Sequence, residues 1–399
     1  MKMGNRRLAL VIAILAALTF AHAPASATAE TMKSFRLPSP LIDVSTPGGH
    51  LQDDRTSPKV NVMLPDGYAS NKRKRYPVLY WLHGGSGGAD TMEESGTLDL
   101  FRDFPGIVVI PDGGQFGIYM NWWNDGQRGG PAWATYHLTT LRRAIEKRYR
   151  IRDGRRWHSL AGNSMGGQGA LRYAAMLPGY FGSAAGISTA LPDMQAPEAE
   201  LGLSVVAGGV AQGVTYPAIF GPADGAYAEG NSSKAVTGNF GHTRLYLTAG
   251  SGTKCPEDPE PSGSDSIIET FIHAQLTPFA DAARGDGAEV TEVPGCGAHT
   301  WETFHRAVRG ALDWGFFRPV TEKPKNWSYE TIATSGEMWG LNFRFHSPPD
   351  SIAGFERKGR SLSATGTGRV QIKAGKKCSL IVNLPFNRRL SRNCLGYLN

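Results

Sequence analysis

Apolar, β-branched stretches alternate with helical patterns from about residue 58 to residue 318. The strand-like runs are residues 59–64, 77–82, 106–110, 158–161, 183–187, 244–248 and 289–293. The runs with apolar residues near helical spacing are residues 131–149, 166–176, 267–283 and 301–314. Such alternation predicts a mainly parallel sheet covered by helices on both faces. Residues 193–241 are rich in Gly and Ala without a clear period and are left unassigned; they lie where an α/β enzyme often inserts a lid or pocket wall.

The pattern changes near Pro319, where residues 321–326 have the composition of a linker. Short β-like runs follow, and Gly, Ser and Pro separate them. These runs are residues 341–345, 369–372 and 379–384. We therefore expect an α/β domain over residues 30–319 and a small all-β domain over residues 320–399.

The N-terminus has the layout of a signal peptide. Lys2, Arg6 and Arg7 precede an apolar stretch, residues 8–20, and small residues suited to cleavage follow at 25–29. The apolar stretch is shorter than the roughly 18–20 residues that a membrane span needs. We expect residues 1–29 to be removed on export and the protein to be secreted or associated with the cell wall.

The formal net charge of +7 is unevenly distributed along the 399 residues. Residues 357–399 contain ten Lys and Arg and no Asp or Glu, whereas residues 30–356 carry a small excess of acids. No recognised nucleic-acid-binding motif accompanies the basic residues, so we expect no nucleic-acid partner. The basic segment is expected either to dock on an anionic cell-envelope polymer or lipid surface, or to be a soluble basic face.

Cysteine usage fits an exported chain. The four cysteines form an even number, which favours two disulfides over a metal site. Their placement suggests the pairs Cys255–Cys296 and Cys378–Cys394, one in each domain, although four cysteines allow three connectivities. No spacing of Cys or His is typical of a metal site, and we expect neither a metal nor a cofactor.

One motif carries the clearest chemistry. Gly162-Asn163-Ser164-Met165-Gly166 fits Gly-x-Ser-x-Gly between a predicted strand and a predicted helix. In that context the pattern is a nucleophile elbow, a tight turn that exposes the serine hydroxyl at the start of a helix. Ser164 is therefore the candidate nucleophile; the alternative is a glycine-rich turn with no catalytic role.

A serine nucleophile needs a base, and hydrolases with this elbow place it late in the chain. His299 lies in a loop after the last predicted strand of the α/β domain, as that order requires. Four other histidines fit less well: His242 precedes a strand, His273 and His305 lie within helical patterns, and His83 belongs to another motif. His299 is the predicted base.

An acid should orient that histidine, and several acids follow the strand at 244–248. The candidates are Glu257, Asp258, Asp265 and Glu269. A common hydrolase layout favours Asp258, because it lies in the loop itself. Glu269 could instead form a helix capping box with Ser266. The chemistry of the residues alone leaves the choice open.

The developing oxyanion needs two N–H donors. One is expected from Met165, the residue after the nucleophile, and the other from the loop that follows strand 77–82. That loop reads His83-Gly84-Gly85-Ser86-Gly87-Gly88, and its glycines allow the backbone to approach a substrate oxygen. We expect the second donor to be the N–H of Gly85; the alternative is a plain glycine turn.

Together these motifs resemble those of the esterase D-type α/β-hydrolases and, within them, the secreted mycolyltransferases of the mycobacterial antigen type. The resemblance covers roughly residues 40–318. It rests on Leu82-His83-Gly84-Gly85, Val109 to Gln115 with Asn121-Trp122-Trp123, the Ser164 elbow, Gly250-Ser251-Gly252-Thr253, Ile267 to Phe271 and His299-Thr300-Trp301. The resemblance implies an α/β-hydrolase fold and a substrate pocket to which His83, Gly84, Trp122 and Trp301 contribute. In those enzymes the acid lies in a segment that matches residues 267–271, which implies Glu269 rather than Asp258.

The sequence also departs from the mycolyltransferases. They carry Asp where this chain has His83 and Arg where it has Ser86, and these side chains help to bind trehalose. The cysteine pair that follows their Trp122-like segment is absent here, and residues 320–399 lie outside the resemblance. We therefore expect a serine esterase or acyltransferase acting on an acylated sugar, lipid or polymer. The alternatives are a mycolyltransferase that uses trehalose-type acceptors and a non-catalytic cell-envelope binding protein.

Overall fold

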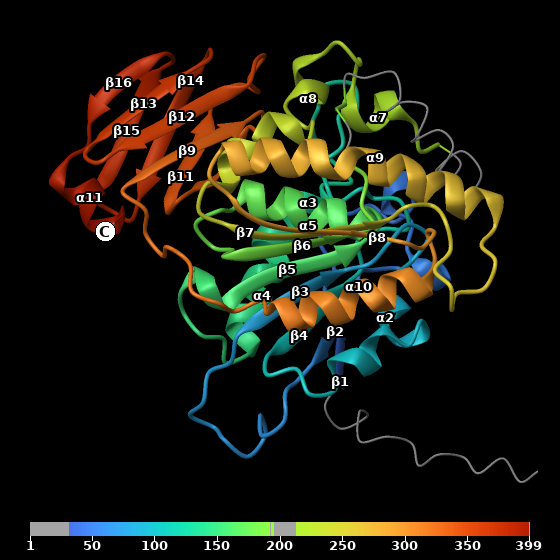
Figure 1. The fold of residues 1–399 in the computed structure, drawn as a ribbon. Helices are drawn as coiled ribbons and strands as arrows, with labels where there is room; N and C mark the ends of the chain where they lie inside the picture. Colours follow the sequence, from blue (N-terminus) through green and yellow to red (C-terminus); the bar gives the residue numbers. More distant parts are fainter. Residues whose placement is uncertain (1–31, 192, 195–212, 399) are drawn as a thin grey trace, which may run out of the picture.

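The structure is a computed structural model that describes residues 32–191, 193–194 and 213–398 (Figure 1). The predicted signal peptide, residues 1–29, lies outside the described residues, as does part of the unassigned segment 193–241. Within the described ranges, no helix is long and apolar enough to cross a membrane.

An eight-stranded sheet forms the centre of the larger part of the molecule, with the strand order β1-β2-β4-β3-β5-β6-β7-β8. The pairs β1–β2 and β2–β4 are antiparallel, and all further neighbours are parallel. The strands are β1 (Met32–Arg36), β2 (Lys59–Met63), β3 (Val78–Leu82), β4 (Ile107–Pro111), β5 (His158–Asn163), β6 (Ser183–Ile187), β7 (Arg244–Gly250) and β8 (Glu289–Gly295). Strands β2 to β8 lie where the sequence predicts them.

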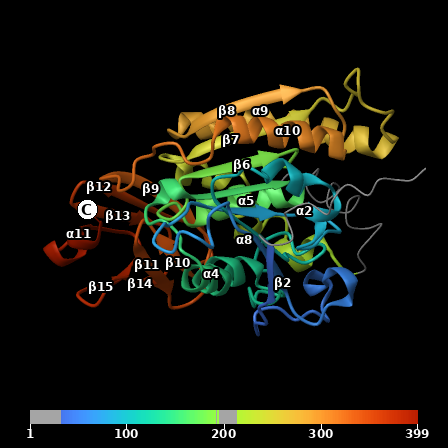
Figure 2. The same ribbon diagram turned by 90° about the horizontal axis from the view of Figure 1, so that it is seen from below.

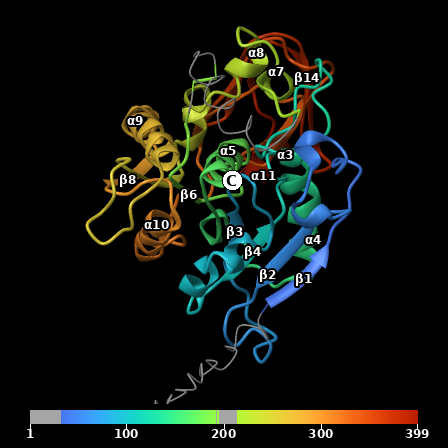
Figure 3. The ribbon, with the colours of Figure 1, turned by 90° about the vertical axis from the view of Figure 1, so that its right-hand side faces the viewer.

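Helices cover both faces of this sheet (Figures 1 and 3). One face carries α3 (Trp133–Thr135), η4 (Tyr136–Leu141), α4 (Arg142–Arg148), α5 (Met165–Met176) and α9 (Gly263–Gly285), and the other carries α2 (Thr91–Glu94), η3 (Thr97–Phe101) and α10 (Trp301–Trp314). Because successive strand residues point to opposite faces, β3 contributes Tyr80 and Leu82 to one apolar core and Leu79 and Trp81 to the other. The predicted α/β-hydrolase fold is confirmed.

Two elements differ from the sequence-based expectation. Strand β1 is not predicted, because none of its side chains is buried and it is held by antiparallel backbone pairing with β2. Helix α9 begins at Gly263, earlier than the predicted start at residue 267. The described residues of the unassigned segment 193–241 include the short helices α7 (Tyr216–Phe220), α8 (Ala226–Glu229) and η6 (Lys234–Phe240).

The C-terminal part consists of two four-stranded antiparallel sheets and a short helix, α11 (Arg392–Leu398). One sheet has the order β10 (Ser335–Met338), β11 (Leu341–Phe345), β14 (Arg369–Ala374), β15 (Cys378–Asn383); the other has β16 (Phe386–Arg389), β13 (Ser361–Thr365), β12 (Ala353–Lys358), β9 (Asn326–Thr331). Residues from both sheets share one apolar core. The all-β character is as predicted, although only β11, β14 and β15 are located by the sequence pattern.

Strand β12 illustrates why the other strands are missed. Its inward positions are Ala353, Phe355 and Arg357, so a buried arginine interrupts the apolar alternation. The Arg357 guanidinium donates hydrogen bonds to backbone carbonyl groups, including that of Gly359. A period-2 apolar pattern cannot reveal a strand that buries a hydrogen-bonded cation.

The two parts contact each other through directed hydrogen bonds. Buried Asn239, in η6, donates to the carbonyl groups of Ala175 and Glu330 and accepts the N–H of Glu330 in β9. The Tyr329 hydroxyl donates to the carbonyl oxygen of Met176 at the end of α5. Strand β9 is thereby fixed against α5 and η6; the domain boundary at residues 319–320 stays a prediction.

The cysteines pair as expected. One disulfide joins Cys255 to Cys296, and the other joins Cys378 in β15 to Cys394 in α11. The first connects the loop after β7 to the loop after β8, and the second fixes the C-terminal helix to its sheet.

A buried histidine supports the edge of the sheet from which the site is built. His137, in η4, donates from Nε2 to the carbonyl oxygen of Asp112 at 2.8 Å and accepts the Tyr173 hydroxyl at Nδ1, also at 2.8 Å. Its ring stacks on that of Trp133. Burial lowers the pKa of His137 from 6.5 to about 3, so the ring is neutral at physiological pH.

The stability of the fold should therefore fall as the pH decreases from 7 to 5. Between the unfolded pKa of 6.5 and the folded pKa of about 3, the unfolded chain binds a proton at His137 that the folded chain does not. This linkage costs about 1.4 kcal/mol per pH unit below the unfolded pKa, or about 2 kcal/mol at pH 5. Urea titrations at both pH values, on the wild type and on H137Q, should show a smaller pH effect in the variant by about that amount. The exposed His346, replaced in H346Q, is the control, and equal pH effects in wild type and H137Q would contradict the assignment.

Candidate active site

Ser164 lies at the tight turn between β5 and α5. Its φ of 53° and ψ of −124° are unusual for a residue with a side chain, as expected for a nucleophile elbow. The turn is held on both sides, because the Ser164 N–H donates to the carbonyl oxygen of Ile187 and the Thr189 hydroxyl donates to that of Ser164. The strained conformation is thus fixed by backbone contacts to β6 and the loop that follows it.

The glycines of the motif are required by close backbone packing. A Cβ atom on Gly166 would lie 2.0 Å from the carbonyl oxygen of Leu82, and one on Gly162 would lie 2.5 Å from the same oxygen. Real Cβ atoms do not approach backbone atoms so closely, so neither position accepts a side chain without moving β3. The turn that presents Ser164 therefore packs directly against the end of β3.

His299 lies beside Ser164, in the loop between β8 and α10. Its Nε2 is 3.0 Å from the Ser164 Oγ, and its Nδ1 is 2.7 Å from Oε2 of Glu269. The loop is tied to the loop after β7, because Gly252 donates to the carbonyl oxygen of Gly297 and Gly297 donates to that of Thr253. The geometry brings together the three residues expected to act as nucleophile, base and acid.

Glu269 is fully buried in α9, and each of its carboxylate oxygens has partners. Oε1 accepts hydrogen bonds from the Ser188 hydroxyl at 2.7 Å and from the Gly250 N–H at 2.6 Å, while Oε2 faces His299. A buried carboxylate is stable only when such donors replace the lost water. The site therefore holds Glu269 in one orientation, with one oxygen turned to the imidazole.

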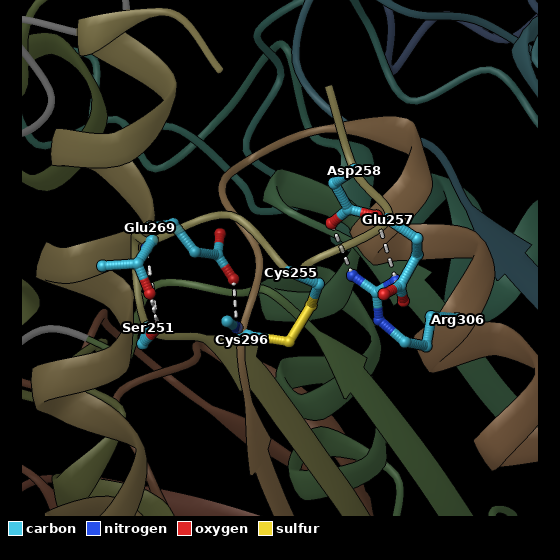
Figure 4. Close-up of a disulfide and its surroundings, with 9 residues drawn as sticks. Ser251, Cys255, Glu257, Asp258, Glu269, Cys296 and Arg306 are labelled. Atoms are coloured by element: carbon cyan, nitrogen blue, oxygen red, sulfur yellow. Dashed lines mark hydrogen bonds and ion pairs between the residues drawn. A yellow bond between two sulfur atoms is a disulfide. The ribbon is translucent and has the colours of Figure 1, made fainter. Parts of the chain in front are cut away.

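Asp258, the alternative acid, is placed elsewhere. Its carboxylate accepts two hydrogen bonds from the Arg306 guanidinium, at 3.2 and 2.8 Å, on the far side of the Cys255–Cys296 disulfide from Glu269 (Figure 4). The pairing with Arg306 lowers the pKa of Asp258 below 3.8. Asp258 thus stabilises a surface loop in this structure, with its carboxylate committed to Arg306.

The capping-box alternative for Glu269 is wrong, because α9 starts earlier than the sequence pattern indicates. The N-cap is Ser262, whose hydroxyl accepts the N–H of Asp265. Glu269 therefore lies beyond the first turn of the helix, where its side chain is not needed for capping.

The expected oxyanion donors belong to backbone segments beside Ser164. A Cβ atom on Gly84 would lie 3.5 Å from the Cβ of Ser164, so the loop after β3 packs against Ser164. Gly85 is exposed, and the next residue, Ser86, donates its N–H to the carbonyl oxygen of Gln115. In the described part of the chain, the N–H groups of Gly85 and Met165 form no hydrogen bond within the protein.

His83, which we expected to line the substrate pocket, is instead buried beneath this loop. Its Nδ1–H donates to the carbonyl oxygen of Gly84 at 2.7 Å, and its Nε2 accepts the N–H of Gly113 at 2.9 Å. Burial lowers the pKa of the ring, which keeps it in the neutral form that this donor–acceptor pair requires. Because both nitrogens are used, His83 positions the loop and offers no polar atom to a substrate.

The two tryptophans that we expected in the pocket lie in different environments. Trp122 is buried, and its indole N–H donates to the carbonyl oxygen of Gly117, so it is a core residue rather than a pocket wall. Trp301 is 37% exposed at the start of α10, two residues after His299, and packs edge-on against Phe304. Of the four predicted pocket residues, Gly84 packs against Ser164, and Trp301 contacts Phe304, whose ring also packs against His299.

Two supporting residues were not predicted. Ser188, which donates to Glu269, directly follows β6, and a polar residue at the carboxyl end of a parallel strand is the signal that could have identified it. The Tyr119 hydroxyl donates to the carbonyl oxygen of His83 from a loop without regular pattern, and nothing in the sequence indicates it. Among the residues described, no group of three or more His, Cys, Asp or Glu could hold a metal ion.

Relatives of this chain were found by sequence. An esterase of Mycobacterium tuberculosis (Rv1288) is 35% identical over 251 residues, which are 60% of this chain and 52% of that protein. The diacylglycerol acyltransferase/mycolyltransferase Ag85B of Mycobacterium leprae is 27% identical over 208 residues, which are 49% of this chain and 61% of that protein. The chain thus spans little more than half the length of these curated relatives.

Solved structures share the fold. MPT51 of Mycobacterium tuberculosis matches with a TM-score of 0.54 and 18% identity, over 72% of this chain and 99% of that one. FphF, a fluorophosphonate-binding serine hydrolase of Staphylococcus aureus, matches with a TM-score of 0.53 and 18% identity, over 72% of this chain and 98% of that one. The sequence profile of the Esterase family matches residues 21–314, well over half of the chain. The protein therefore belongs to the Esterase family.

Proposed function

We propose that this protein is a serine carboxylic-ester hydrolase or acyltransferase that works through an acyl-enzyme on Ser164. The observation that carries the proposal is the continuous hydrogen-bonded chain from Ser164 to His299 to Glu269, with distances of 3.0 and 2.7 Å. A strained serine hydroxyl, a base within reach of its proton and a buried carboxylate behind the base form the arrangement that activates serine. Membership of the Esterase family supports the same reaction.

In the first half of the reaction, the Ser164 Oγ attacks the ester carbonyl carbon while its proton moves to Nε2 of His299. The negative charge that develops on the carbonyl oxygen is stabilised by the N–H groups of Met165 and Gly85. Glu269 stabilises the imidazolium from the Nδ1 side. His299 then gives its proton to the leaving alcohol oxygen, the ester C–O bond breaks, and the acyl group remains on Ser164.

In the second half, an acceptor hydroxyl attacks the acyl-serine. His299 removes the acceptor's proton, and the tetrahedral intermediate collapses as that proton returns to the Ser164 Oγ. Water as the acceptor gives a free acid, and a sugar hydroxyl gives a new ester. We propose water as the principal acceptor, because the buried His83 replaces a side chain that binds trehalose in the mycolyltransferases that the sequence resembles. Transfer to a trehalose-type acceptor is the alternative.

A non-catalytic cell-envelope binding protein is the alternative from another class, since a fold does not fix a function. The geometry around Ser164 argues against it, because a strained serine and a buried carboxylate would both cost stability without serving a reaction.

We also propose that the protein acts outside the cytoplasm, as its two disulfides favour. Docking of the C-terminal part on an anionic envelope surface stays a prediction. Among the ten basic side chains of residues 357–399, Arg357 is buried and the others are exposed.

Ser164 should be the residue that reacts with a fluorophosphonate probe. We expect the folded wild type to be labelled on the peptide that contains Ser164, and S164A to lose both the label and p-nitrophenyl acetate hydrolysis, by at least about 10³-fold in kcat. The matched control is S159A, which changes a serine buried in the same strand. Folded wild-type protein that stays unlabelled at Ser164 would favour the non-catalytic alternative.

Glu269 rather than Asp258 should be required for catalysis. We expect E269Q to lower kcat by about 10³- to 10⁴-fold, because the amide cannot stabilise the imidazolium. D258N removes the acid that pairs with Arg306 and should keep most of the activity. Steady-state kinetics on p-nitrophenyl esters compare the two variants. A large loss in D258N together with an active E269Q would reverse the assignment.

Water should outcompete trehalose as acceptor. With p-nitrophenyl esters of increasing chain length, we expect the free acid as the main product whether or not trehalose is added. The products can be separated by mass spectrometry, with glucose as a control acceptor. Formation of acyl-trehalose faster than the free acid would establish the transferase alternative.

A further inference from the structure

A cavity of about 480 Å³ lies between the C-terminal β part and the α/β part. One wall is the outer face of the sheet that contains β10, β11 and β14, and the opposite wall comes from η4, α4, α5 and the loop after β4. Figure 2 shows β10, β11 and β14 beside α4. The volume is within the range of sites for small ligands, roughly 300–1,000 Å³.

The walls of this interdomain cavity are strongly cationic. Among the residues described, Glu337 is the only acid in the lining, whereas six basic side chains reach it: Arg128, Arg142, Arg143, Arg172, Arg344 and Lys373. Arg142 has carboxylate partners, Glu146 at 3.6 Å and Glu337 at 3.8 Å. Within the described part of the chain, no carboxylate lies within 4.0 Å of the other five cations.

Two of these cations are fixed by neutral groups. Arg128 donates to the carbonyl oxygens of Ile332 at 3.0 Å and Pro349 at 2.7 Å, and its guanidinium lies over the Tyr227 ring. Arg172 donates to the side chain and the carbonyl oxygen of Asn231. In the described chain, the Nε of each guanidinium is buried without a hydrogen-bond partner. Both positive charges are thus held in place by neutral groups, and Asp350, the acid that acts on Arg128 from a longer distance, offsets only part of the cost of its burial.

The burial has an energetic signature. Partial burial lowers the pKa of both Arg128 and Arg172 below the usual range of an arginine, because desolvation disfavours the charged form. Desolvated charges are costly unless they are paired, so half-buried cations with no carboxylate of the described chain within 4.0 Å favour the binding of an anion from outside the protein.

The neutral polar side chains that line the cavity suit a ligand that carries hydroxyl groups as well as a negative charge. Amides and hydroxyls surround the cations, and they can both donate to and accept from ligand hydroxyl groups. Ser335, Asn342 and Gln371 are lining residues whose side chains form no hydrogen bond within the described part of the chain. Asn121, Thr139 and Asn231 also line the cavity, and their side chains are already hydrogen-bonded to the protein. Bidentate guanidinium groups recognise carboxylate and phosphate, and amide and hydroxyl groups recognise sugar hydroxyls.

We propose that the interdomain cavity binds an anionic saccharide, with a carboxylate- or phosphate-bearing sugar unit held by Arg172, Arg344 and Lys373. The site is separate from the nucleophile. Arg172 follows Ser164 by eight residues on α5, which is about 12 Å along a helix axis. Binding requires no esterase activity; only the further step, in which the bound saccharide is part of the ester substrate, depends on the proposed function.

The test is isothermal titration calorimetry on the full chain carrying S164A, so that hydrolysis cannot alter the ligand. The probes are a galacturonate trisaccharide, glucose 6-phosphate, neutral maltotriose and inorganic phosphate. We expect one of the two anionic saccharides to bind one-to-one and at least about tenfold more tightly than maltotriose and inorganic phosphate. The galacturonate and the sugar phosphate distinguish a carboxylate ligand from a phosphate ligand.

The matched variants compare cations inside and outside the cavity. R344A/K373A removes two exposed cations of the cavity wall and should weaken binding at least about tenfold. K376A/K377A removes the same charge from an exposed turn of the same sheet and should leave the affinity unchanged. Circular dichroism and thermal unfolding verify that both variants fold.

Several results would overturn the proposal. These are an absence of saturable binding by either anionic saccharide, equal affinity for maltotriose, and equal affinity for inorganic phosphate, which would indicate a simple anion site. Equal losses in the two double variants would also overturn it, because they would mean diffuse surface attraction. None of these results affects the Ser164 labelling experiment, so the two proposals fail separately.

Discussion

The close packing of β3, β5 and α5 is the constraint on which the candidate site depends. The carbonyl oxygen of Leu82 occupies the space that side chains on Gly162 and Gly166 would need. This contact lets the first turn of α5 lie against the end of β3, and it brings the Gly84–Gly85 backbone beside Ser164. Because β3 and β5 to β8 are parallel, the loops at their carboxyl ends meet at the same edge of the sheet. Ser164, the Gly84–Gly85 loop and the loop of His299 therefore converge from strands that are distant in sequence.

Buried polar groups then turn this convergence into a fixed geometry. Glu269 could not be an ion in the core without the Ser188 and Gly250 donors, and those donors follow β6 and end β7. His83 acts in the same way beneath the oxyanion loop, where a neutral ring bridges Gly84 and Gly113. Each of these residues orients a neighbour rather than contacting a substrate. Their hydrogen bonds explain why the site is held by the sheet edge rather than by its loops alone.

Local pattern was sufficient to predict the central strands and the Ser164 elbow, because strands buried on both faces are continuous apolar runs and the elbow glycines are a steric requirement. The pattern could not choose between Asp258 and Glu269, since both follow β7 in sequence. The choice depends on a tertiary contact, in which Arg306 of α10 binds Asp258, and on the true start of α9 at Gly263. Only the family resemblance pointed to Glu269.

The sequence pattern also could not predict which polar side chains are buried. His83 stands in a glycine loop that must approach a substrate, and sequence alone does not say that its ring turns inward to bond Gly113. Arg357 leads to a different error: it is a buried cation at an inward position of β12, so the apolar alternation that would predict this strand is interrupted. In both cases hydrogen bonds to distant backbone make burial of a polar side chain favourable, and a one-dimensional pattern contains no information about those partners.

The position of the basic side chains in the C-terminal part is more informative than their total charge. Along the sequence the basic residues of 357–399 form one excess, but in the structure Lys373 joins Arg344 on the cavity wall that faces Arg128 and Arg172 of the α/β part. The contacts that join the two parts, such as those of Asn239 and Tyr329, are directed to backbone groups. In the described part of the chain, these four cations have no carboxylate within 4.0 Å. If stability alone were selected, apolar residues would fill this space at lower cost. The family profile ends at residue 314, before β9, so one wall of the cavity lies outside the region shared with the family. A site built across that boundary is therefore a property of this combination of domains, and it can vary while the chemistry at Ser164 stays the same.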